Sequence, residues 1–120
     1  MTSASSVDQA LSQCIHGLVK AYVYRKSKAK SGIEWDGDRN NVPAKYRDAR
    51  EKVCRDAFLR LRACKAKEDF VSYFTGTICS VPQYLPEAEY QTVADAMLTD
   101  ERWEEVKALA MLALSGFSNV

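Results

Sequence analysis

The hydrophobic positions of the chain repeat with the spacing of α-helices, and no segment shows a convincing β-strand alternation. The first pattern predicts a helix over about residues 7–29. Its apolar positions recur every three or four residues: Leu11, Ile15, Leu18 and Tyr22. Ser6, followed three residues later by Gln9, is typical of a capping box and predicts where this helix begins.

A stretch of turn-forming residues separates this helix from the next. Residues 31–42 are rich in Gly, Asp and Asn and predict a loop, in which Trp35 either pins the loop to the core or presents an aromatic surface to a partner. Pro43 suits the first position of a second helix that extends to about residue 66. Its apolar stripe is Tyr46, Val53, Ala57, Leu61 and Cys64. Arg50 lies near this stripe, so its charge must meet an acid, a carbonyl or a partner.

Three further patterns complete the chain. Glu68 and Asp69 suit the start of a third helix, because acidic side chains favour the positive end of a helix dipole. The apolar side of that helix is Phe70, Val71, Phe74 and Ile78. A fourth helix begins at Pro86, and Thr99–Asp100 caps a fifth. Leu109 and Leu112 lie away from the main stripe of the fifth helix, which predicts either a central position or docking on another chain.

These patterns predict an all-α fold, a compact bundle of about five helices that forms a single domain over residues 1–120. The net charge is only +1, but the charges are unevenly distributed. Residues 20–67 hold 15 of the 17 Lys and Arg residues against six acids, whereas residues 68–120 hold nine acids against two bases. A basic half (1–67) and an acidic half (68–120) indicate polyanion binding, head-to-tail self-association, or both.

The cations of the basic half recur on the expected outer faces of its two helices. Lys20, Tyr24 and Lys28 are spaced four residues apart, opposite the apolar stripe, and Lys45 and Lys52 lie seven apart, as do Arg55 and Arg62. Such a pattern suits a phosphate backbone, with a tyrosine that can stack on an unpaired base. The predicted nucleic-acid-binding residues are Lys20, Tyr24, Arg25, Lys26, Lys28, Lys45, Lys52, Arg55 and Arg62.

Two alternatives to nucleic-acid binding remain open for these cations. They can dock an acidic protein partner, or they can belong to a solvated face with pairs such as Asp48–Lys52 and Glu51–Arg55. Cations at the end of the first helix also complement its dipole. No residue pattern favours readout of base edges, so we expect any nucleic-acid binding to be independent of sequence.

Catalytic and metal-binding patterns are missing from the sequence. His16, the one histidine, has no nearby nucleophile pattern, and no glycine-rich phosphate loop occurs. The four cysteines lie far apart and suit reduced, buried side chains in a reducing cytosol. No apolar run reaches the roughly 20 residues of a membrane span, and no secretory signal is present. We therefore expect a cytoplasmic, non-enzymatic protein without catalytic residues, metal or cofactor.

Three runs in the acidic half resemble a known family. They are DFVSYFTGTICS at 69–80, VPQYL at 81–85 and WEEVKALAMLALS at 103–115. These runs are similar to the C-terminal helical region of the large subunit of type I CRISPR Cascade complexes, of the I-B kind. The resemblance covers about residues 65–118. The basic half resembles the family only in its general character. In such systems this region is also made separately, from an internal start codon, as the Cascade small subunit, and a chain beginning at Met1 would match that product.

The resemblance implies a non-catalytic helical bundle, present in several copies in an RNA-guided antiviral complex; some systems of this kind serve transposons instead. It implies packing on other copies of itself and on the Cascade backbone and large subunits that hold the guide RNA. It also implies that target or displaced DNA is held through its backbone, which stabilises the R-loop, while base pairing supplies specificity. The acidic half can then meet the basic half of the next copy. The rival hypothesis is a helical adaptor whose basic face docks an acidic protein.

Overall fold

The computed structural model describes residues 2–38, 40–78 and 98–118, and within these ranges it contains helices and no strand. The α-helices are α1 (Thr2–Ser31), α2 (Ala44–Ala63), α3 (Lys67–Tyr73) and α5 (Trp103–Ser118). A short π-helix, η1 (Phe74–Ile78), continues α3 directly. The all-α prediction is confirmed, and the predicted helix from Pro86 lies outside the described residues.

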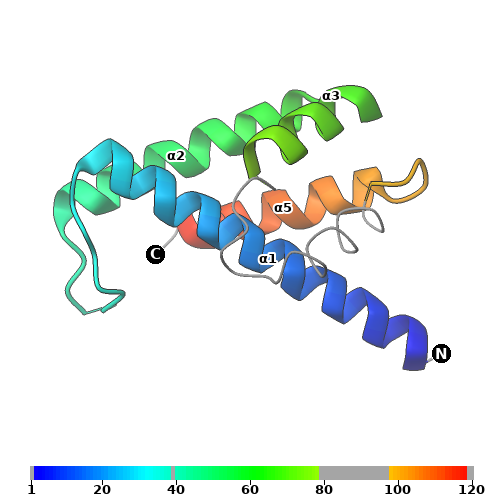
Figure 1. The fold of residues 1–120 in the computed structure, drawn as a ribbon, viewed down its shortest axis with the longest axis horizontal. Helices are drawn as coiled ribbons and strands as arrows, with labels where there is room; N and C mark the ends of the chain where they lie inside the picture. Colours follow the sequence, from blue (N-terminus) through cyan, green and yellow to red (C-terminus); the bar gives the residue numbers. More distant parts are fainter. Residues whose placement is uncertain (1, 39, 79–97, 119–120) are drawn as a thin grey trace.

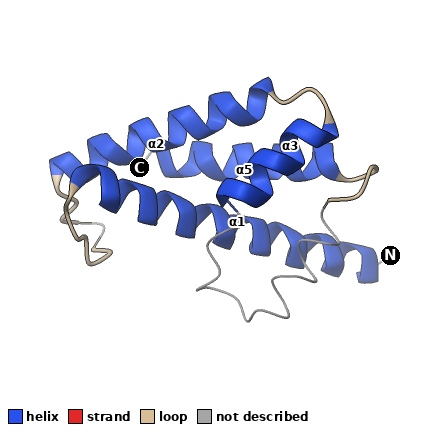
Figure 2. Ribbon diagram, turned by 45° about the horizontal axis from the view of Figure 1, so that its top comes forward, coloured by secondary structure: helices blue, strands red, loops and turns tan. Residues whose placement is uncertain are grey.

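Helices α1, α2 and α5 pack against one another (Figure 1). Helix α2 returns antiparallel to α1, and α5 runs antiparallel to α2, as Figures 1 and 2 show. The segment α3–η1 packs against α5 and α1. The buried core is formed by the inward faces of all these helices: Leu11, Ile15, Leu18, Val19, Val53, Ala57, Leu61, Phe70, Phe74, Ile78, Val106, Ala110 and Leu114.

Helix α1 is longer than the sequence pattern predicted. It begins at Thr2, so the predicted start at Ser6 is wrong. Residues 2–6 contain no Gly or Pro, and extending an existing helix is far easier than nucleating one. The helix ends at Ser31 because Gly32 takes a left-handed conformation (φ 72°). The N–H of Gly32 donates a hydrogen bond to the Lys28 carbonyl at 2.8 Å, a common arrangement at the C-terminal end of a helix.

The segment α3–η1 follows the predicted apolar side closely. Phe70, Phe74 and Ile78 are fully buried, whereas Val71 is half-buried. The rings of Phe70 and Phe74 stack with centroids 5.2 Å apart, and Trp103 lies 5.8 Å from Phe70. These aromatic contacts fix α3 against the start of α5.

Helix α5 begins at Trp103, later than the predicted cap at Thr99–Asp100. The carboxylate of Asp100 does not cap it; instead it pairs with Lys67 of α3 at 2.7 Å. Helix α5 contacts α1, α2 and α3, yet Leu112 remains 70% exposed. The contacts with three other helices agree with the predicted central position, whereas docking of α5 on another chain stays a prediction. No described helix is long and apolar enough to cross a membrane.

Candidate nucleic-acid interface

The outer face of α2 carries the clearest group of accessible cations. Its inward side, which includes Tyr46, Val53 and Leu61, is buried, so the predicted stripe is confirmed. The cations predicted on the opposite side are all exposed: Lys45, Lys52, Arg55 and Arg62. We call these four residues the α2 cationic face. Because side chains seven residues apart lie along one side of a helix, the face extends from Lys45 to Arg62, over almost five turns.

The charges of the α2 cationic face have no acidic partner among the described residues. The pairs Asp48–Lys52 and Glu51–Arg55 have suitable spacing, but no ion pair forms in either. Within residues 2–38, 40–78 and 98–118, none of the four cations makes an ion pair. The α2 cationic face therefore keeps its charge available for a partner.

The cations of α1 are exposed but do not lie on one face. Leu11, Ile15 and Leu18 are buried in the first part of α1, and Val23 and Ser27 are buried near its end. The buried side thus changes along α1, because its last turns also meet α2 and the loop that follows. Lys20, Arg25 and Lys26 remain exposed, but the end of α1 presents its cations in several directions.

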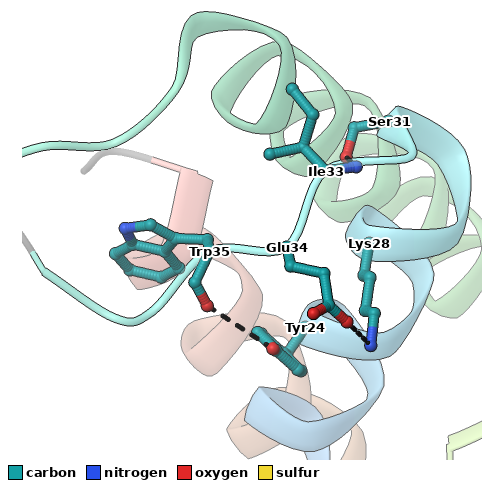
Figure 3. A network of polar contacts seen from close by, with 6 residues as sticks. All are labelled: Tyr24, Lys28, Ser31, Ile33, Glu34 and Trp35. Carbon is teal, nitrogen blue, oxygen red and sulfur yellow. Dashed lines mark hydrogen bonds and ion pairs between the residues drawn. The ribbon is translucent and has the colours of Figure 1, made fainter.

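Tyr24 and Lys28, both predicted DNA contacts, touch the loop between α1 and α2 (Figure 3). The half-buried Tyr24 donates a hydrogen bond from its hydroxyl to the Trp35 carbonyl at 3.4 Å. Lys28 forms an ion pair with Glu34, which raises the pKa of Lys28 and lowers that of Glu34. Both partners are charged above the ordinary pKa of a glutamate. The ion pair is lost when the pH falls through the lowered pKa of Glu34, because its carboxylate is then protonated.

Trp35 pins the loop to the bundle, which confirms the first of its two interpretations. Its ring centroid lies 5.1 Å from that of Tyr46, a residue that is 1% exposed. The Arg50 guanidinium, which is buried, lies 5.7 Å from the Trp35 ring and 5.9 Å from the Tyr46 ring. Trp35 also donates from Nε1 to the Asp38 carbonyl at 3.0 Å. The charge of Arg50 thus meets aromatic faces.

We expect Trp35→Ala to lower the free energy of unfolding by about 1–3 kcal/mol, because the half-buried ring and its contact with Arg50 are lost. Trp35→Phe keeps an aromatic ring at this position and should lose less than half as much. Urea unfolding followed by circular dichroism measures both variants. A Trp35→Ala protein as stable as the wild type would show that the loop is not held by this ring.

The structure also brings together residues that the sequence pattern did not connect. The Arg60 guanidinium lies 5.5 Å from the ring centroid of Tyr73, which belongs to α3. A second contact of this kind is local: Lys26 Nζ lies 6.0 Å from the ring centroid of Tyr22, four residues earlier on α1. Arg60 was not among the predicted contacts. Its exposed position next to α3 depends on tertiary packing, and no local spacing indicates it.

His16 and the cysteines are the groups considered for catalysis. His16 is exposed and its ring lies 5.1 Å from that of Phe117. Cys14, Cys54 and Cys64 carry reduced thiols, and burial raises the pKa of Cys54 to about 11, so this thiol stays protonated at neutral pH. Cys79 lies outside the described residues. No group of three or more His, Cys, Asp or Glu side chains within the described ranges could hold a metal ion.

These observations define a helical bundle with a cationic outer helix. The family model described as "Type I-B CRISPR Cas8b C-terminal domain" matches residues 1–117, and the chain belongs to this family. The match confirms the resemblance found in the acidic half and extends it over the basic half as well. The chain is thus a component related to the Cascade complexes of type I-B CRISPR systems. No curated protein and no solved structure matched in the corresponding comparisons.

Proposed function

We propose that the chain is a non-catalytic part of a cytoplasmic, RNA-guided Cascade complex that binds the DNA backbone without sequence specificity and stabilises the R-loop. The α2 cationic face is the observation that carries this proposal. It offers four exposed cations without ion pairs in the described parts of the chain, and phosphate binding releases counterions from the DNA. The guide RNA supplies specificity by base pairing, so the protein needs only backbone contacts.

The same proposal includes neighbouring subunits as partners. The turn before α5 exposes Glu101, and α5 itself exposes Glu104, Glu105 and Leu112. Acidic and apolar groups of this kind suit a protein surface rather than DNA. We propose that this part of the chain meets another copy or the Cascade backbone and large subunits, and that the α2 cationic face meets DNA.

One observation favours the alternative of a protein adaptor. Leu59 lies among the cations of α2 and is 51% exposed. Phosphate contacts do not need an apolar side chain, whereas an acidic protein with an apolar anchor could use it. The two functions differ in their target, so direct binding measurements separate them.

The proposed function predicts similar affinity for DNA of unrelated sequences. Two labelled duplexes of equal length and different sequence should bind the chain, free or within its Cascade complex, with affinities within about threefold at low salt. Fluorescence anisotropy measures both, and Glu104→Gln, on the acidic surface, serves as a control expected to bind no less tightly. Absence of DNA binding at low salt, together with capture of an acidic protein, would favour the adaptor instead.

A further inference from the structure

Where α1, α2 and α3 meet, two cations lie over two tyrosines. We call the four residues Lys26, Arg60, Tyr22 and Tyr73 the tyrosine junction; they come from three helices. Arg60 lies over the Tyr73 ring and Lys26 over the Tyr22 ring. The two hydroxyl groups interact, since the Tyr22 hydroxyl contributes, after burial, to a raised pKa of Tyr73. Both cations therefore lie against one pair of interacting tyrosines, Tyr22 and Tyr73.

The two rings are fixed and the two cations are accessible. Tyr22 is 6% exposed and Tyr73 is half-buried, so their packing within the bundle sets their positions. Arg60 and Lys26 are both exposed. A guanidinium held over a ring on one side presents its other side to solvent, and that planar surface can stack on an unpaired base.

A shallow depression adjoins Arg60 on the α2–α3 side. It has a volume of about 300 Å³ and is lined by Arg60, Ala63, Cys64, Asp69 and Ser72. The Asp69 carboxylate repels a phosphate placed in the depression itself. The depression therefore suits the uncharged part of a nucleotide better than its phosphate.

We infer that the tyrosine junction binds an unpaired nucleotide of single-stranded DNA, with the base against Arg60 and the phosphate toward Lys26. This inference rests on the proposed function, and it adds a preference for unpaired over paired DNA. A base inside a duplex is stacked on its neighbours and cannot offer its face to Arg60. The α2 cationic face, by contrast, contacts phosphates of either kind of DNA.

Arg60→Lys tests the inference, because it keeps the charge and removes the planar group. We expect the full chain to bind a labelled single-stranded 20-mer about 5- to 10-fold more weakly after this change. Its affinity for the duplex of the same sequence should stay within about twofold. Arg47→Lys is the matched control, since Arg47 is an exposed arginine of the same helix that belongs neither to the α2 cationic face nor to the tyrosine junction; it should change both affinities less than about twofold.

The outcomes separate this inference from the proposed function. Equal affinities of Arg60→Lys and the wild type for single strands, or an equal loss for single strands and duplex, overturn the tyrosine junction as a nucleotide site. The proposed function then still stands if reversing the charges of the α2 cationic face abolishes binding of both DNA forms. If that reversal has no effect while Arg60→Lys selectively weakens single-strand binding, the junction stands and the α2 cationic face does not. Unfolding curves of each variant confirm that it is folded.

Discussion

Replacing Phe70 by alanine is expected to lower the free energy of unfolding by about 3–5 kcal/mol. Phe70 is fully buried, stacks on Phe74 and contacts Trp103. Its removal leaves a cavity where α3 meets α5, and the neighbouring rings can fill it only in part. Since the free energy of unfolding of a small domain is only about 5–15 kcal/mol, the Phe70→Ala variant should retain little stability.

Chemical denaturation of the wild type and Phe70→Ala measures this difference. Val71→Ala is the matched control, because Val71 is the next residue of the same helix and is only half-buried. It should cost about 1 kcal/mol or less. Equal losses for the two variants would contradict the packing of α3 on α5 described above.

The triple variant Lys52→Glu, Arg55→Glu and Arg62→Glu is expected to bind DNA about 100-fold more weakly near physiological salt. Each phosphate contact adds roughly 1 kcal/mol through counterion release under these conditions, and three contacts are lost. The three side chains are exposed, so the fold should be retained with a change in unfolding free energy of about 1 kcal/mol or less.

Lys65→Glu is the control for a general effect of lost positive charge. Lys65 is exposed in the connection between α2 and α3, outside the α2 cationic face. Its reversal should weaken DNA binding by less than about threefold, because distant exposed charges are screened by salt. A triple variant that binds DNA as well as the wild type, while losing an acidic protein partner, would support the adaptor hypothesis.

Local periodicity was sufficient to predict α2 and its two faces. Tyr46, Val53 and Leu61 are buried, and Lys52 and Arg55 are exposed, as a 3.6-residue period requires. The helix is covered on one side along its length, so a single stripe describes it. The same reasoning located the buried side of α3–η1.

Helix α1 shows why the same reasoning was incomplete elsewhere. Its buried side changes before Val23 and Ser27, because the neighbours of α1 change along its length. Periodicity assumes one constant buried face and cannot reveal such a change. As a result, Tyr24 and Lys28 were placed on an open strip, whereas both contact the loop that returns toward α2.

Contacts between distant segments were also beyond local patterns. Arg60 reaches Tyr73 only because α3 packs beside α2, and Arg50 finds Trp35 only because the loop folds back. The sequence did indicate that Arg50 needed a partner, since a charge near an apolar stripe must be compensated. The sequence could not indicate that the rings of Trp35 and Tyr46 would lie against the Arg50 guanidinium.

The salt dependence of DNA binding tests the central claim most directly. The affinity of the wild-type chain for a duplex should fall linearly in a plot of log K against log salt concentration. In the triple variant the slope should be smaller in magnitude by about 3, close to one for each cation removed. An equal slope for the two proteins, or wild-type binding that does not depend on salt, would contradict phosphate contact by the α2 cationic face.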